Sequence, residues 1–193
     1  MTESPETPPA WPPYDIGPHD AVFALGVASL NYARLEFAFS HLFAIVLGIT
    51  NNDAWAVLPT INNYERLLRM RDDLQTLNWP ADTKNRVSHF MDAFKILADN
   101  RNLLDHSNIF SGTDLPISLY KYDRDGNTIH TVVTTEDLRQ VADDMMAFFN
   151  YGLSFGNSIA PDGTEGTIVS RKFPSQPPLP QKLNYTTQPL QLS

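Results

Sequence analysis

The sequence predicts a mostly α-helical bundle with two long helices and a β-hairpin inserted before the last helix. Three observations predict this class. Apolar residues recur at helical spacing through most of the middle of the chain. Capping residues or glycines flank the long periodic segments. A stretch just before the last of these segments has instead the composition of two strands around a tight turn.

The chain is expected to hold one globular domain between two proline-rich ends. Its 193 residues, of which 42% are hydrophobic and 11% aromatic, are enough for a packed core. Prolines cluster in both terminal regions, where large aliphatic residues are few. We therefore expect a disordered N-terminal arm over residues 1–18, an ordered domain over 19–158, and an extended or disordered tail over 159–193.

The first half of the domain is predicted to contain three helical segments. Asp20 can start a long helix that runs to about Gly48, which is a plausible stop. The apolar residues of this helix lie on nearly all of its sides, which is typical of a helix that is central or shared with a second subunit. We therefore expect a homodimer. A short helical piece over residues 51–58 and a more polar helix over 62–77 follow.

The second half is predicted to contain two helices and the hairpin. Residues 80–82 open a long helix that runs to about Ile109, before a glycine. Two β-type runs over 117–122 and 128–134 flank the turn Asp123-Arg-Asp-Gly126, which predicts a β-hairpin. Thr134 or the threonine after it then caps a last helix over roughly 136–157.

Charge and composition limit the kinds of function. The net charge of −8 argues against a broad, non-specific grip on nucleic acid, although it leaves a small local site open. The chain contains no cysteine, so disulfides and thiolate zinc sites are excluded. Its histidines are scattered without ligand spacing, and we expect neither a metal nor a cofactor.

The sequence also bears on location. The most apolar stretch, residues 21–49, is interrupted by Arg34, Glu36 and His41, so a membrane helix is not expected. The N-terminus has no basic start and no apolar run, unlike a secretory signal. We therefore expect a cytoplasmic protein.

A nucleophile-like pattern lies near the end of the last predicted helix. Gly152-Leu-Ser154-Phe-Gly156 matches the pattern of serine hydrolases. That motif needs a strand before the serine and a helix after it, within a parallel sheet. Because this copy lies at the end of a helix, we do not interpret it as a catalytic site.

The end of the helix predicted over 82–109 carries the polar residues with the clearest chemistry. Its apolar stripe consists of Val87, Phe90, Phe94, Leu97 and Ala98. Arg101 continues this stripe one turn further on, and Asp105 follows on nearly the same line. Asn102 and His106 share the neighbouring flank. An inward-facing guanidinium costs desolvation energy unless it is paired, so the cluster indicates either a structural ion pair between Arg101 and Asp105 or a functional site.

The run Arg101-Asn102-Leu-Leu-Asp-His106 resembles the Arg-polar-x-x-x-His signature of the HEPN superfamily of helical domains. Its setting, late on a long helix of a bundle, is similar as well. The resemblance implies a metal-independent endoribonuclease, or a relative that has kept the site for binding only. It also implies a dimer in which two such motifs line one cleft.

The resemblance further implies a role for each residue. His106 would act as general acid or base on the ribose 2′-hydroxyl or the leaving oxygen. Arg101 would hold the scissile phosphate, and Asn102 would orient that phosphate or His106. The expected product is a 2′,3′-cyclic phosphate, and a toxin or defence setting is the expected context. The alternative is a non-catalytic helical dimer that binds a partner protein or a nucleotide and uses the same cluster for structure.

Three polar residues interrupt the first predicted helix: Asn31, Arg34 and Glu36. One of them can reach the cluster at Arg101, and we expect Glu36 to pair with Arg101 in support of the site, next to Asp105. The alternative is that all three form the solvent-exposed edge of their helix.

Overall fold

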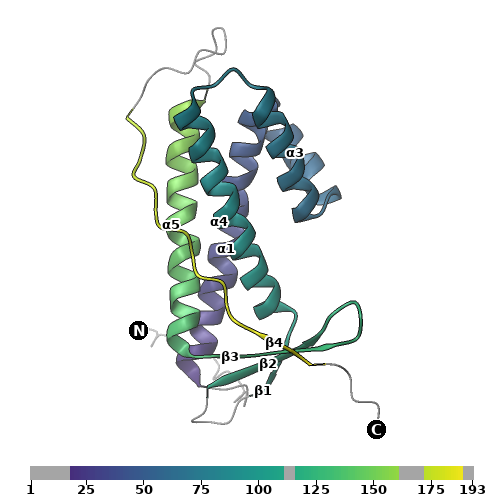
Figure 1. Ribbon diagram of the computed structural model, residues 1–193. Helices are drawn as coiled ribbons and strands as arrows, with labels where there is room; N and C mark the ends of the chain where they lie inside the picture. Colours follow the sequence, from purple (N-terminus) through teal and green to yellow (C-terminus); the bar gives the residue numbers. More distant parts are fainter. Residues whose placement is uncertain (1–17, 111–115, 161–171, 189–193) are drawn as a thin grey trace, which may run out of the picture.

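The computed structural model describes residues 18–110, 116–160 and 172–188. The fold is mostly helical, with a small antiparallel sheet, as predicted. Three long helices lie side by side: α1 (His19–Leu47), α4 (Ala81–Asp105) and α5 (Thr135–Ile159). The sheet lies across one end of these helices, and α3 packs near the other end (Figure 1). The arm predicted before residue 18 lies outside the described residues.

Local capping explains four of the helix boundaries. Gly48 ends α1 in the left-handed conformation, at φ 64°, and its N–H bonds back to the last turn. Thr50 forms a reciprocal capping box at the start of α2 (Asn51–Val57), which continues into a 3₁₀ turn (Leu58–Thr60). Asn62 forms the same kind of box at the start of α3 (Asn63–Thr76). Thr134 does so at the start of α5, the helix predicted after the hairpin, which has 25 residues.

The helix α4 ends earlier than predicted. It stops at Asp105, where His106 leaves the helix with φ −112° and ψ 11°. Asn108–Phe110 then form β1 instead of a further turn of helix. They pair with β2 (Ile117–Tyr122), and these non-local hydrogen bonds outweigh the local helical preference.

The predicted hairpin forms the centre of the sheet. Strand β2 pairs with β3 (Thr128–Val133) around a turn in which Gly126 has a φ of 81°. The Asp123 carboxylate accepts hydrogen bonds from the backbone N–H groups of Asp125 and Asn127, which fixes the turn. The four strands found within the described residues pair antiparallel in the order β1-β2-β3-β4.

The core lies where the three long helices meet. Phe39 of α1 and Phe94 of α4 stack with their ring centroids 4.2 Å apart. A Cβ added at Gly152 of α5 would lie 2.4 Å from Cε2 of Phe90, so a glycine is needed for the close approach of α5 to α4. A Cβ at Gly156 would similarly lie 2.7 Å from the His41 ring. The two glycines of the hydrolase-like pattern are therefore explained by helix packing, and no nucleophilic role of Ser154 is needed to explain them.

Helix α1 is the central helix of the bundle and packs against α2, α3, α4 and α5. Even so, Phe23, Leu30 and Phe37 remain exposed, at 75%, 69% and 45% of their surface. They recur every seventh residue and so form one stripe along the helix. No single described helix is long and apolar enough to cross a membrane. Helix α1 and residues 51–60 reach that length and composition only when taken together, and they are bent by 111° relative to each other.

The described part of the C-terminal tail is extended and packs on the domain. Residues 172–188 run along α4 and α5 towards the sheet, where β4 (Thr186–Gln188) pairs with β3 (Figure 1). Arg86 donates a hydrogen bond to the Pro174 carbonyl at 3.0 Å, and His89 donates one to the Pro177 carbonyl at 2.8 Å. The proline-rich segment forms no helix, because proline has no backbone N–H to donate. Its carbonyl groups instead accept hydrogen bonds from side chains of α4.

Candidate functional site at the end of α4

The last turn of α4 brings four of the sequence-predicted site residues together. Nε of Arg101 lies 2.6 Å from a carboxylate oxygen of Asp105. Nη1 of Arg101 lies 3.4 Å from Oδ1 of Asn102 and 3.5 Å from Nε2 of His106. The cluster forms because i, i+4 residues share a helix face and because the chain turns out of the helix at His106.

Side chains of helix α1 contact this cluster. The Arg101 guanidinium lies over the Tyr32 ring, with its carbon 5.3 Å from the ring centroid. The Ser29 hydroxyl donates to the other oxygen of the Asp105 carboxylate at 3.3 Å. Asn63 of α3 donates to the Tyr32 hydroxyl at 3.0 Å. Burial, together with the nearby carboxylate of Glu36, raises the pKa of Tyr32 to about 12, so this phenol is neutral and the charge above it belongs to Arg101.

The predicted pairing of Glu36 with Arg101 is wrong. Glu36 lies 3.5 Å from Nη1 of Arg66 in α3, whereas Arg101 pairs with Asp105. The Asn31 amide instead donates to the Ala142 carbonyl of α5 at 2.9 Å. Glu36 lies one turn beyond Tyr32 along α1, and there the neighbouring basic side chain comes from α3.

The sequence interpretation missed Tyr32 and Ser29 as neighbours of the site. An aromatic residue within an apolar run indicates a core position, and Tyr32 is indeed only 4% exposed. A serine carries little signal by itself. Ser29 and Tyr32 are three residues apart and so share one face of α1. This spacing indicates a site only once the helix that faces them is known.

The cluster is partly open to solvent. The side chains of Arg101 and Asp105 are 34% and 23% exposed, and His106 is an exposed residue. A part-exposed ion pair within one helix stabilises the fold by only about 0.3–0.5 kcal/mol. Its main consequence is geometric, because it holds the guanidinium edge towards Asn102 and His106. A nitrogen of the guanidinium and one of the imidazole therefore lie close enough to contact one bound anion together.

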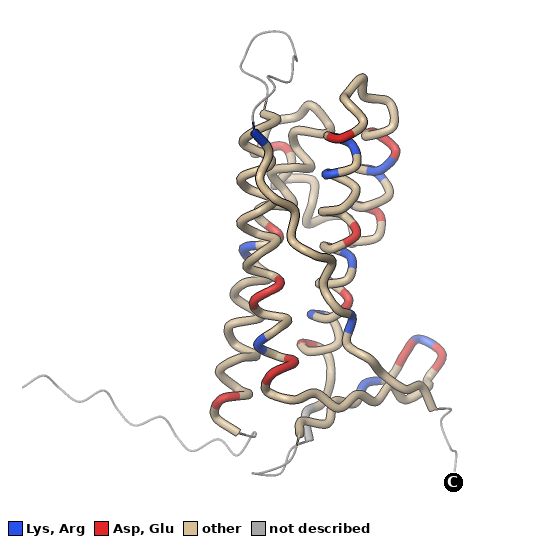
Figure 2. Tube along the Cα trace, turned by 60° about the vertical axis from the view of Figure 1, so that its left-hand side comes forward, with Lys and Arg blue, Asp and Glu red and all other residues tan. Residues whose placement is uncertain are grey.

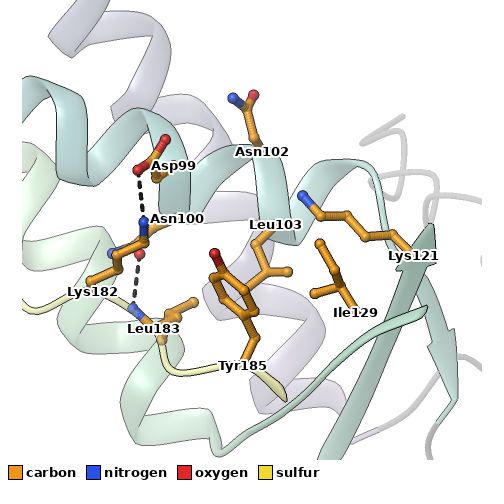
Figure 3. Close-up of a pocket in the computed structure, with 9 residues that line it drawn as sticks. All are labelled: Asp99, Asn100, Asn102, Leu103, Lys121, Ile129, Lys182, Leu183 and Tyr185. Atoms are coloured by element: carbon orange, nitrogen blue, oxygen red, sulfur yellow. Dashed lines mark hydrogen bonds and ion pairs between the residues drawn. The ribbon is translucent and has the colours of Figure 1, made fainter. Parts of the chain in front are cut away.

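Two hollows flank the cluster and are lined by the hairpin and the tail. One is lined by His106 together with Lys121, Tyr122 and Arg124 of the hairpin. The other is lined by Asn102, Lys121 and residues of the tail (Figure 3). The sequence interpretation missed Lys121, because nothing local connects a strand residue to the end of α4.

Charge elsewhere on the molecule is mixed. Figure 2 shows lysine and arginine interspersed with aspartate and glutamate along the described helices, without one broad basic face. Within the described residues, no group of three or more histidine, aspartate and glutamate side chains is arranged to hold a metal ion. No family model matches this sequence, and no curated protein or solved structure is significantly similar to it.

Proposed function

We propose that the protein is a metal-independent endoribonuclease of the HEPN type, with its site at Arg101, Asn102 and His106. The observation that carries the proposal is the pairing of an exposed imidazole with a fixed guanidinium: Nε2 of His106 lies 3.5 Å from Nη1 of Arg101. A phosphate bound there would contact both a cation and an imidazole that can act as a general acid or base.

The proposed reaction uses the nucleophile that RNA itself carries. The ribose 2′-oxygen attacks the adjacent phosphorus, and the bond from phosphorus to the 5′-oxygen breaks. The products are a 2′,3′-cyclic phosphate and a 5′-hydroxyl. One proton leaves the 2′-oxygen and one is delivered to the 5′-oxygen, and His106 carries one of these transfers. Arg101 stabilises the charge on the phosphate, and Asn102 orients it.

A homodimer belongs to the same proposal. A single imidazole carries only one of the two protons at a time, and a second copy would supply another. The exposed stripe of Phe23, Leu30 and Phe37 offers an apolar face on α1. Ser29, which contacts Asp105, precedes Leu30 on the same helix but lies about 100° around it, so the stripe and the candidate site occupy different faces of α1.

The dimer is tested by measuring the mass in solution by light scattering at micromolar concentration. We expect twice the chain mass for the parent protein and a single chain mass for Leu30→Asp. Leu179→Asp, at another exposed leucine, in the tail, is the control and should leave the mass unchanged. A parent protein of single chain mass would contradict the dimer.

The nuclease activity is tested with end-labelled RNA in the presence of a chelator. The parent protein should cleave the RNA and leave cyclic phosphate ends. His106→Ala should lower the rate by about 100-fold or more, as is usual for loss of a general acid or base, with an unchanged circular dichroism spectrum. His19→Ala, at another exposed histidine, is the control and should cleave normally. A parent protein that leaves every tested RNA intact contradicts the proposal.

We also propose a context for this activity. The resemblance implies a toxin or defence setting, and the sequence pattern favours a cytoplasmic location. Because the chain carries a net charge of −8, a small or structured RNA suits it better than bulk degradation of long RNA.

A second candidate function is a non-catalytic helical dimer that binds a partner protein or a nucleotide. It is favoured by the 2.6 Å ion pair of Arg101 with Asp105, because both members of this pair also contact α1, Asp105 through Ser29 and Arg101 through the Tyr32 ring. In that case the parent protein is inactive, and changes at Arg101 or Asp105 reduce stability.

A further inference from the structure

The hollow beside Asn102 has three walls that come from distant parts of the chain. Figure 3 shows Asn102 and Leu103 of α4, Lys121 and Ile129 of the hairpin, and Lys182 and Tyr185 of the tail around one space. Its volume of about 290 Å³ is enough for part of a small polar ligand. Leu103 is buried and Ile129 partly buried, so the hollow has an apolar floor beneath polar walls.

The walls combine positive charge with an aromatic ring. Lys182 pairs with Asp99 at 2.9 Å, and this bond raises the pKa of the ammonium, which stays protonated. The same ammonium lies 5.9 Å from the centroid of the Tyr185 ring. Lys121 enters from the opposite wall, on strand β2. Two ammonium groups, the Asp99 carboxylate that pairs with one of them, and a half-exposed ring thus line one space, which leaves Lys121 as its unpaired cation among the lining residues.

The tail forms a fixed wall of this hollow. The Asn100 side chain, only 1% exposed, donates to the Gln181 carbonyl and accepts from the Leu183 N–H, both at 2.9 Å. The Thr131 hydroxyl donates to the Asn184 carbonyl, and β4 then joins the sheet. These bonds hold the backbone on both sides of Lys182 and Tyr185 in position before any ligand binds, which lowers the entropic cost of binding.

The hollow is continuous with the candidate site. Asn102 lines it and also lies 3.4 Å from Nη1 of Arg101. Lys121 and Ile129 line both this hollow and the one that contains His106. A strand of RNA with a phosphate at Arg101 and His106 would therefore meet Lys121 next.

We propose that this hollow is a subsite for the nucleotide adjoining the scissile phosphate in single-stranded RNA. Lys121 and Lys182 hold its phosphate, and its base stacks on Tyr185. This inference takes its substrate class, RNA, from the proposed function. It goes further by naming which nucleotide of the RNA the protein contacts and which residues make the contact. Base stacking on an aromatic ring with a nearby cation is a common way to hold single strands without reading their sequence.

The subsite is tested by binding rather than by cleavage. The anisotropy of a labelled oligouridine is titrated with His106→Ala protein in a chelating buffer, at several salt concentrations. Adding Lys121→Met, which keeps the apolar stem, should lower the affinity several-fold and reduce the slope of log affinity against log salt by about 0.7. Adding Tyr185→Leu should lower the affinity by about fivefold or more. Lys172→Met, at an exposed lysine of the same tail, removes the same charge and should change neither quantity.

A second ligand separates the phosphate contact from the stacking contact. Inorganic tripolyphosphate carries phosphate without a base, so Lys121→Met should weaken its binding while Tyr185→Leu should not. The subsite is overturned if oligouridine does not bind, or if Lys121→Met and Tyr185→Leu behave like Lys172→Met. A parent protein that binds RNA through these residues but does not cleave it would overturn the nuclease and leave the subsite standing. If the parent protein cleaves RNA and neither Lys121→Met nor Tyr185→Leu changes that cleavage, the subsite is overturned and the nuclease stands.

Discussion

The middle and the end of α4 meet the same neighbouring helix with opposite chemistry. Phe94, in the middle, is fully buried and stacks on Phe39 of α1 at 4.2 Å. Arg101, two turns later on the same face, is a third exposed and pairs with Asp105. Tyr32 contacts both, since its ring lies 6.1 Å from that of Phe94 and 5.3 Å from the guanidinium of Arg101.

The difference shows how a polar site can adjoin an apolar core. The Tyr32 ring contacts both the Phe94 ring and the Arg101 guanidinium, and its hydroxyl accepts a hydrogen bond from Asn63. The apolar core is thus closed by a residue that also accepts a cation over its face. We therefore expect the middle of α4 to determine stability and its end to determine activity.

The largest expected effect is on stability at the middle of α4. Phe94→Ala removes a fully buried ring and should lower the free energy of unfolding by about 3–5 kcal/mol. Urea denaturation followed by circular dichroism measures this loss. A loss below about 1 kcal/mol would mean that the core collapses around the missing ring, and the contrast between the two regions would disappear.

The next effect concerns Tyr32, at the boundary. Its pKa is raised from 10.0 to about 12, so the folded protein keeps the phenol neutral where the unfolded chain ionises it. The stabilisation is fully present below pH 10 and is lost as the pH rises to 12, at about 1.4 kcal/mol for each pH unit. Unfolding measured across this range should be less pH-dependent in Tyr32→Phe. Equal slopes in the two proteins would show that the phenol is not shielded.

The smallest effect on stability is expected at the end of α4. Arg101→Met should cost at most about 1 kcal/mol of unfolding free energy, because the ion pair it removes is part-exposed. Arg86→Met is a matched control: Arg86 also pairs with an aspartate one turn away on α4 and lies over an aromatic ring, 5.0 Å from the Phe173 centroid. Only Arg101→Met should abolish cleavage of RNA. If Arg101→Met destabilises as strongly as Phe94→Ala, the cluster is structural and the second candidate function is favoured.

Much of the fold could be predicted because its signals are local. The start of α5 at Thr134 and the hairpin turn at Gly126 depend on residues within one turn of each other. The gathering of Arg101 with Asp105 and His106 likewise follows from helical spacing and a helix end. The early end of α4 could not be predicted in the same way, because β1 depends on pairing with β2 rather than on its own residues.

The sequence by itself determined the helices, the hairpin and the polar end of α4, since short-range hydrogen bonds and side-chain periodicity encode each of them. Only the tertiary structure decided which side chains surround that polar end. Ser29 and Asp105 are 76 residues apart in the chain, and Asp99 and Lys182 are 83 apart. Such contacts depend on how whole helices and the tail pack together, because a side chain carries no local record of the distant residue that it will face.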